Sequence, residues 1–189
     1  MTHFHVGPGR TGLAPLRHLL DEFDISPASV YPTHVERNES LMLQAIALTK
    51  RGVTVDLDTV ENDLEKWIGF FRAQGGDPAF LTVSSDAAIS SPLTLHRQFK
   101  AVAKKGIYPF EQLLSMFTAN TARVLKLARK GRLAQHFAAD LIVLEKDSYE
   151  IRHVIAGGRL LVKDGVVSLQ EQFLEQSNRR ISLYGKKSA

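Results

Sequence analysis

The sequence predicts an α/β protein in which a parallel sheet is followed by a small antiparallel β-sheet. A short β-prone run followed by a helical apolar pattern occurs four times before residue 106, and this alternation is typical of parallel βα units. After Gly131 the character changes, and short β runs separated by turn residues follow. We therefore expect an α/β unit over residues 1–130, a small sheet over residues 131–169, and a polar basic tail over residues 170–189.

The composition is that of an ordinary globular protein. Of 189 residues, 44% are hydrophobic and 23% are charged. The chain has no cysteine, which excludes disulfides and thiolate metal sites, fits a reducing compartment, and leaves His, Asp and Glu as possible ligands. No apolar run approaches the roughly 20 residues that span a bilayer, and the N-terminus has no signal-peptide pattern. We expect a cytoplasmic protein with no membrane partner.

The formal charge of +4 comes from 24 basic and 20 acidic residues. Part of the excess is in the polar tail, at Arg179, Arg180, Lys186 and Lys187. Elsewhere the basic residues form scattered pairs, whereas nucleic-acid binders usually have a basic stripe interleaved with aromatic residues. We therefore expect no nucleic-acid partner.

Turn and capping residues separate the predicted elements of the first part. Gly7-Pro8-Gly9 ends the first strand, and Gly75-Gly76 ends the third helix. Asn38 or Ser40 can cap the second helix. The predicted strands cover residues 2–6, 30–34, 53–57 and 80–83, and the predicted helices cover residues 11–23, 41–51, 64–73, 95–105 and 110–127.

In the second part, β runs occur at residues 140–144, 151–155 and 159–162. Gly157-Gly158 separates the last two runs, and a pair of glycines suits a two-residue hairpin turn. Asp164-Gly165 is a further turn signal. Consecutive short strands joined by tight turns predict an antiparallel sheet.

Three predicted strands end at residues that can carry chemistry. His34 lies at the end of the second strand, with Glu36 and Arg37 directly after it. His5 ends the first strand, and Asp86 follows the fourth. Because α/β proteins place their chemistry at the carboxyl ends of parallel strands, we expect these side chains to share one site.

These residues lie in motifs that resemble the C-terminal half of the amidohydrolase superfamily, and within it the isoaspartyl (β-aspartyl) dipeptidases. The resemblance implies half of a (β/α)8 TIM-type barrel, with about four βα units, followed by part of a small β-sandwich. The matching motifs are Phe4-His5-Val6-Gly7, Pro32-Thr33-His34-Val35-Glu36-Arg37-Asn38, Val55-Asp56-Leu57-Asp58 and Ser84-Ser85-Asp86.

The resemblance also implies roles for five residues. His5 and His34 would be metal ligands at the ends of barrel strands five and six. Asp86 would bind metal and act catalytically, by taking a proton from the attacking water. Arg37 and Ser90 would bind the free carboxylate of a dipeptide substrate. A metal-activated water and a bidentate arginine suit these tasks.

The implied cofactor is a divalent metal, most simply zinc. The family binds two ions through a first-strand His-x-His pair and a fourth-strand lysine that this chain lacks, so we expect at most one here. The string His3-Phe4-His5 imitates the first-strand pair. Its following turn and the 29-position step to His34 instead fit the pair on strands five and six.

Other interpretations of the same residues stay open. Asp86 could cap the next helix, Arg37 could be a surface helix residue, and His34 could be a solvated loop residue. We have no role for Asp56 and Asp58 beyond loop hydrogen bonds. The remaining histidines are expected to be structural, at His18, His96, His136 and His153.

A complete barrel of this type needs about 250 residues and eight strands, and four βα units leave open sheet edges. The chain is then either a fragment that needs a complementing N-terminal half, or a unit that pairs with itself as a homo-oligomer. We expect a hydrolase that cleaves an amide or isopeptide bond of a small β-aspartyl peptide, inactive alone. The alternatives are a non-catalytic protein that associates through its open edges, and a dihydroorotase-like or deaminase-like enzyme.

Overall fold

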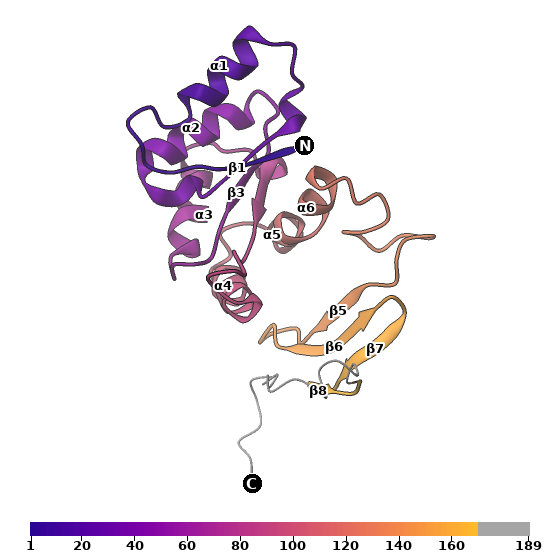
Figure 1. Cartoon of the computed structure of the whole chain (residues 1–189). Helices are drawn as coiled ribbons and strands as arrows, with labels where there is room; N and C mark the ends of the chain where they lie inside the picture. The colour runs from indigo at the N-terminus through magenta and orange to yellow at the C-terminus, as the bar shows by residue number, and fades with distance from the viewer. Residues whose placement is uncertain (170–189) are drawn as a thin grey trace. The chain divides into compact units, whose positions relative to one another are not determined.

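The computed structural model describes residues 1–169 and confirms the α/β class (Figure 1). The chain divides into two units, Met1–Arg132 and Leu133–Ala189, and each is described by itself. The first contains parallel strands and helices, and the second contains an antiparallel sheet. The predicted polar tail at residues 170–189 lies outside the described residues.

Two parallel strand pairs form the centre of the first unit. β1 (Thr2–His5) pairs with β2 (Val30–Thr33), and β3 (Val55–Leu57) pairs with β4 (Leu81–Val83). β2 also lies beside β3. Every residue of β2, β3 and β4 is buried, as expected for parallel strands covered on both faces. Strands buried in this way can present chemistry only at their ends.

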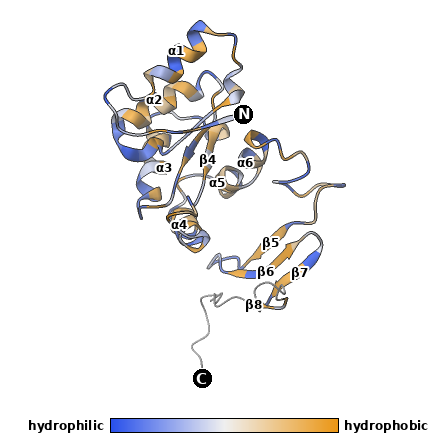
Figure 2. Ribbon diagram, viewed as in Figure 1, coloured by the Kyte–Doolittle hydropathy of each residue, from blue (hydrophilic) through white to orange (hydrophobic). Residues whose placement is uncertain are grey.

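A helix follows each of these strands, as predicted (Figures 1 and 2). The Asn38 side chain caps the second helix by accepting a hydrogen bond from the Leu41 N–H at 2.8 Å. Short 3-10 turns connect several of the elements. The helices are α1 (Ala14–Glu22), α2 (Glu39–Thr49), α3 (Leu64–Ala73) and α4 (Pro92–Lys105), and the 3-10 turns are η1 (Pro27–Ser29), η2 (Val35–Arg37) and η3 (Pro78–Phe80).

Two helix predictions need correction. α4 begins at Pro92, three residues earlier than predicted, because the Ser91 side chain accepts a hydrogen bond from the Thr94 N–H. The proposal that Asp86 caps this helix is therefore wrong. The single helix predicted over residues 110–127 is two helices, α5 (Phe110–Phe117) and α6 (Ala119–Val124).

The break between α5 and α6 is at Thr118, whose backbone leaves the helical region (φ −132°, ψ −83°). Its hydroxyl donates to the Leu114 carbonyl at 2.8 Å, and the Thr121 hydroxyl donates to the Met116 carbonyl at 3.1 Å. Such side-chain bonds compete with the regular main-chain ladder. The apolar pattern alone conceals this competition because it continues across both helices.

The second unit is a four-stranded antiparallel sheet, in the order β5-β6-β7-β8. Gly157 and Gly158 both have positive φ, 56° and 79°, as a type I′ hairpin turn requires, which confirms the predicted turn. β8 is a strand that the sequence signals did not resolve. The strands are β5 (Leu141–Leu144), β6 (Ile151–Ala156), β7 (Arg159–Lys163) and β8 (Val166–Val167).

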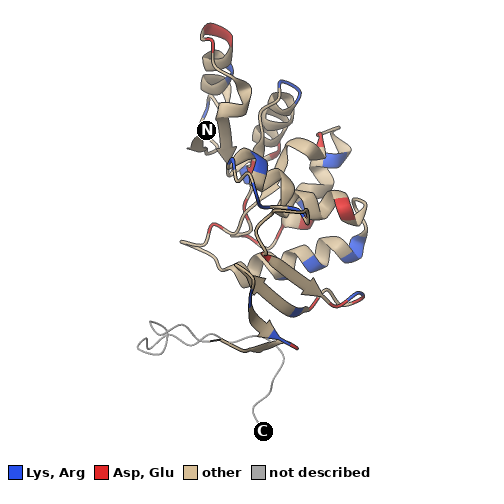
Figure 3. Cartoon of the chain, turned by 90° about the vertical axis from the view of Figure 1, so that its right-hand side faces the viewer, with Lys and Arg blue, Asp and Glu red and all other residues tan. Residues whose placement is uncertain are grey.

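Within residues 1–169, none of the helices combines the length and the hydropathy that a bilayer crossing requires. Basic and acidic positions are spread over several elements of the chain (Figure 3).

Candidate active site

Two of the predicted ligands meet at the carboxyl ends of β1 and β2. His5 is the last residue of β1, and His34 follows Thr33, its partner in the register. The two imidazoles face each other, with His5 Nδ1 2.9 Å from His34 Nε2. Parallel pairing therefore brings together two histidines that are 29 residues apart in the sequence.

Two of the predicted ligands also have strained backbones. His34 has φ 65° and Asp86 has φ 46°, and they are two of the six non-glycine residues with positive φ in the described chain. This conformation costs on the order of 1–3 kcal/mol for a residue with a side chain, and such strain concentrates at functional sites. At His34 the left-handed turn comes between β2 and η2, where it directs the ring toward its partners.

Asp58 lies behind His34 and orients its ring. Its Oδ2 atom is 2.5 Å from His34 Nδ1 and 3.0 Å from Arg37 Nη2. Because an ionised carboxylate can only accept hydrogen bonds, both nitrogens donate to the same Asp58 oxygen. We therefore assign the proton of His34 to Nδ1, which leaves the Nε2 lone pair directed at His5.

The charge of Asp58 is stabilised by its neighbours. Burial alone would raise the pKa of this carboxyl. The neighbouring Glu36 carboxyl, the hydrogen bonds from His34 and the Val60 N–H, and the Arg37 charge together outweigh burial and hold the pKa of Asp58 below its usual value. Asp58 is thus an ionised partner for both the imidazole and the guanidinium.

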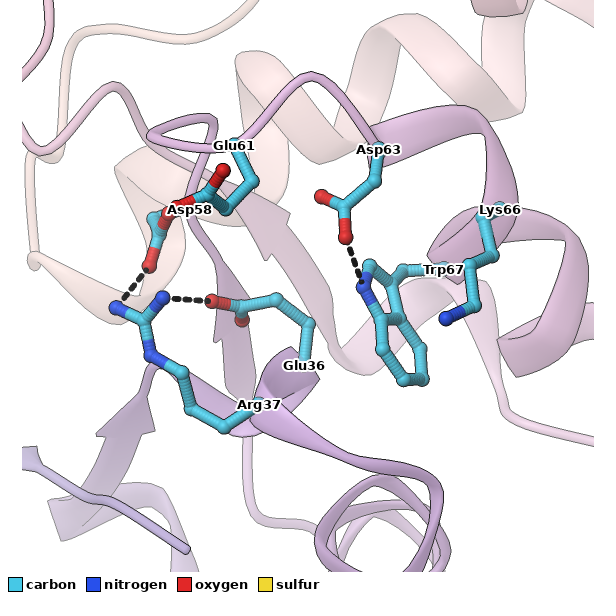
Figure 4. Close-up of a pocket in the computed structure, with 7 residues that line it drawn as sticks. All are labelled: Glu36, Arg37, Asp58, Glu61, Asp63, Lys66 and Trp67. Carbon is cyan, nitrogen blue, oxygen red and sulfur yellow. Dashed lines mark hydrogen bonds and ion pairs between the residues drawn. The ribbon is translucent and has the colours of Figure 1, made fainter.

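Arg37 is held in place by acidic neighbours and is partly exposed to solvent. Besides Asp58, its guanidinium approaches Glu36, with Nη1 3.8 Å from Oε1 (Figure 4). The Arg37 side chain is 31% exposed, so part of the guanidinium can reach an external anion. A cation that is held in place and partly exposed is well suited to bind a carboxylate.

Glu36 differs from Asp58 although the two lie close together. Its side chain is only 5% exposed, and in the part of the chain that the structure describes neither carboxyl oxygen has a hydrogen-bond partner. Burial, followed by the adjacent Asp58, raises the pKa of Glu36 to about 9. Without a further partner, this carboxyl holds its proton at neutral pH.

Asp56, on β3, links this strand to β2 and β4 through hydrogen bonds. Its carboxylate is 1% exposed and accepts four hydrogen bonds, from the hydroxyls of Tyr31 (3.1 Å), Thr33 (2.8 Å), Thr82 (2.7 Å) and Ser84 (2.6 Å). These donors come from β2, from β4 and from the residue after β4. Burial raises the pKa of Asp56 against the opposing effect of the four hydroxyls. The network holds the three strand ends in register.

The other two predicted site residues, Asp86 and Ser90, follow β4 in the same loop. Asp86 is half-buried in the loop after β4, and its carbonyl accepts hydrogen bonds from the Ile89 and Ser90 N–H groups at 2.9 Å. No hydrogen bond joins Asp86 or Ser90 to His5, His34 or Arg37 in the described part of the chain. Their predicted roles therefore stay predictions.

The donor set suits a divalent ion at His5 and His34. Two nitrogens on one tetrahedral zinc lie about 3.3 Å apart, close to the 2.9 Å between the facing ring nitrogens. Within residues 1–169, His34, Glu36 and Asp58 also have donor atoms that all lie within 4.8 Å of one another. There, however, Arg37 Nη2 is already 3.0 Å from both His34 Nδ1 and Asp58 Oδ2.

Sequence reasoning missed Asp58 as a site residue, and it placed Glu36 near the site without assigning it a role. One signal for Asp58 was available, because Asp56 and Asp58 are two positions apart at a strand end and so project to the same side. Which partner each would meet depends on the neighbouring strands. No sequence signal indicated that Glu36 would be buried, because an acidic residue in a turn is usually solvated.

Comparison with known proteins adds independent evidence. The model of the family described as "Amidohydrolase family" matches residues 5–161. Two structures of a β-aspartyl dipeptidase from Fervidobacterium islandicum AW-1 are similar over 91% of this chain. The one in complex with a β-Asp-Leu dipeptide has a TM-score of 0.83 and 30% identity, and the other has a TM-score of 0.82 and 32% identity. The chain covers 49% and 48% of these proteins, so it spans about half of their length.

Two further matches are more limited. An adenine deaminase from Halalkalibacterium halodurans is 37% identical over 79 residues, which are 40% of this chain and 13% of that protein. An adenosine deaminase from Xanthomonas campestris, solved with bound zinc, has a TM-score of 0.58 at 16% identity. That match covers 91% of this chain and 47% of the deaminase. The second similarity supports the fold alone.

Proposed function

This chain belongs to the amidohydrolase family, and we propose that it provides the C-terminal half of the active site of a β-aspartyl dipeptidase. The observation that carries the proposal is the His5–His34 pair, whose facing nitrogens are 2.9 Å apart and which is backed by Asp58. The similarity to a dipeptidase crystallised with β-Asp-Leu supports this substrate class.

His5, His34 and Asp86 would hold one divalent metal, most simply zinc. When bound, such an ion lowers the pKa of water and polarises a carbonyl. Asp58 keeps the His34 proton on Nδ1, so Nε2 is available as a ligand, and a carboxylate behind a ligating histidine is a common arrangement in metal sites. The chain thus contains both the ligands and the group that orients one of them.

The remaining residues act on the peptide. The Asp86 carboxylate takes a proton from the attacking water and passes it to the leaving amine. Arg37, held by Asp58 and Glu36, binds the free carboxylate of the substrate, with the Ser90 hydroxyl as a second donor. Cleavage of the isopeptide bond then releases aspartate and a free amino acid.

We further propose that the four βα units are half of a (β/α)8 barrel and that the chain is inactive alone. The missing strands would come from a complementing N-terminal half or from a second copy of this chain. β1 is consistent with this, because three of its four residues are exposed although it pairs with β2 on one side. An unpaired strand edge tends to bind another strand. We place the protein in the cytoplasm, as its composition led us to expect.

A second candidate function is deamination, which the match to an adenine deaminase favours. A third is a non-catalytic protein that associates through the β1 edge. Arg37 separates the first two, because a neutral purine base offers no carboxylate for its exposed guanidinium. The edge-association alternative predicts an oligomer that survives both a chelator and His34→Ala.

The test is turnover of β-Asp-Leu with added zinc. The chain is assayed alone, mixed with the N-terminal half of the Fervidobacterium dipeptidase, and fused to that half. We expect activity only with the second half present, and its loss in His34→Ala. Adenine is the comparison substrate. If the fused protein bound zinc but did not hydrolyse β-Asp-Leu, the dipeptidase proposal would be wrong.

A further inference from the structure

A pocket of about 330 Å³ opens beside Arg37. It lies between η2, the loop after β3, and the start of α3 (Figure 4). Four of its lining side chains are acidic and two are basic. The acidic residues are Glu36, Asp58, Glu61 and Asp63, and the basic residues are Arg37 and Lys66. Even with Glu36 counted as neutral, the acidic groups outnumber the basic ones, and this excess favours a cationic occupant.

The Glu36 side chain points to a ligand independently of this charge excess. It is 95% buried, lines the pocket, and neither of its oxygens has a hydrogen-bond partner within the described residues 1–169. The nearest cationic nitrogen is Arg37 Nη1 at 3.8 Å, which is beyond hydrogen-bond distance. A buried carboxyl group without a partner is costly, and its oxygens can accept hydrogen bonds from an occupant in either protonation state.

The occupant is better described as an organic cation than as a metal ion. A metal bound by His34, Glu36 and Asp58 would have to displace Arg37, whose Nη2 is 3.0 Å from both His34 Nδ1 and Asp58 Oδ2. The pocket is also far larger than one ion. Its wall includes the Trp67 indole, whose Nε1 donates to Asp63 Oδ2 at 2.7 Å, and an indole can pack against an aliphatic side-chain stem.

We propose that this pocket binds the cationic side chain of the amino acid that the enzyme releases, so that the preferred substrates are β-aspartyl-arginine and β-aspartyl-lysine. Arg37 would hold the α-carboxylate of that amino acid while its side chain extends past Trp67 toward Glu36. The assignment of the cation to the leaving amino acid rests on the proposed function. The cation preference of the pocket rests on the pocket alone.

Trp67 makes the test direct because it is the sole tryptophan of the chain. Its fluorescence is followed while L-arginine or L-citrulline is added to the full chain in the presence of a chelator. These two amino acids have similar shapes and differ in the charge of the side chain. We expect a saturable change with arginine, with affinity about tenfold higher than for citrulline, as charge-assisted hydrogen bonds imply.

Two matched variants place the binding in the pocket. Glu36→Gln keeps the shape of the side chain and should weaken arginine binding about fivefold. Glu65→Gln makes the same chemical change at an exposed position on α3, where Glu65 pairs with Lys105 at 3.3 Å, and should leave binding unchanged. Circular dichroism checks that both variants fold.

Equal responses to arginine and citrulline would overturn the proposal, as would no saturable response. Arginine binding that Glu36→Gln does not weaken would also overturn it, and so would saturation by calcium ion but not by arginine. The fused enzyme separates this proposal from the function. Equal hydrolysis of β-Asp-Arg and β-Asp-citrulline would remove the cation preference and leave the dipeptidase standing. Saturable arginine binding without hydrolysis of either peptide would keep the cation preference of the pocket and remove the dipeptidase proposal.

Discussion

The two units use their strands in opposite ways. In the first unit, β2, β3 and β4 are wholly buried, and polar side chains gather where these strands end. In the second, the antiparallel sheet leaves apolar side chains in solvent, with Ile142 62% exposed and Leu160 41% exposed. In Figure 2, most of β5 and β6 is coloured as hydrophobic. In a sheet that is covered on both faces, only the residues at the strand ends can take part in chemistry. In a sheet with an exposed face, the side chains along the strands are themselves accessible.

Residues of one type show the same contrast. His34 is buried between Asp58 and His5, whereas His153 is on β6 and its Nδ1 accepts a hydrogen bond from the Asp164 N–H. Asp56 has four hydroxyl donors in the core, whereas the Asp164 side chain is 58% exposed. Environment, and not residue type, therefore separates a site residue from a surface one.

The largest difference is expected for apolar truncations. Leu81→Ala on β4 removes a side chain that is 0% exposed and should lower the free energy of unfolding by about 2–5 kcal/mol. Ile142→Ala on β5 should cost less than about 1 kcal/mol, because its side chain already contacts water. Urea denaturation measures both. Equal losses would mean that the exposed face of β5 is covered in solution.

Zinc affinity should distinguish His34 in the first unit from His153 in the second. His34→Ala removes a proposed ligand and should weaken zinc binding about 100-fold or more, since loss of even an outer-shell partner costs 10–100-fold. His153→Ala should leave zinc affinity unchanged. Competition with a chromophoric chelator gives both affinities. Similar affinities for the two variants would place the metal elsewhere.

Substitution of the aspartates should affect stability. Asp56→Asn places an amide NH₂ among hydroxyl donors and should cost about 2 kcal/mol of unfolding free energy. Asp164→Asn changes an exposed side chain and should stay within about 0.5 kcal/mol. Thermal unfolding of both variants measures the difference. A stable Asp56→Asn protein would show that the hydroxyls reorient without loss.

Asp58 should affect metal affinity through His34. Asp58→Asn weakens the acceptor for the Nδ1 proton, so we expect about tenfold weaker zinc binding. In ¹⁵N spectra of the metal-free chain, His34 should shift away from the Nδ1–H tautomer. Asp58→Glu, which restores a carboxylate, should recover part of the affinity. An unchanged tautomer together with unchanged zinc affinity would remove the orienting role of Asp58.

A smaller effect concerns pH. Because burial raises the folded-state pKa of Asp56 above 3.8, the folded state keeps this proton to higher pH than the unfolded state does. This contribution to stability is complete at low pH and is lost as the pH rises through the folded-state pKa. The stability gap between the wild type and Asp56→Asn should therefore narrow as the pH rises above 3.8. A gap that widens would mean that the four hydroxyl donors outweigh burial.

Local patterns predicted most of the elements. Apolar spacing located the first four helices, and Gly157-Gly158 and Asp164-Gly165 located two turns of the second unit. The pattern failed at Thr118, because residues on both sides of the break keep a helical apolar spacing while side-chain hydroxyls bond the carbonyls there. It also placed the start of α4 three residues too late, since Ser91 and Pro92 begin the helix before its apolar face begins.

The sequence by itself determined that His5 and His34 end neighbouring parallel strands, because strand periodicity and connection length are local properties. Only the tertiary structure decided that Asp58 reaches His34 and Arg37 and that Asp56 instead meets hydroxyls. It also decided that Glu36 lines a pocket without a hydrogen-bond partner among residues 1–169. The physical reason is that hydrogen bonds and burial depend on which strands lie side by side. Two carboxylates two positions apart in one chain therefore acquire different partners, and their pKa values shift in opposite directions.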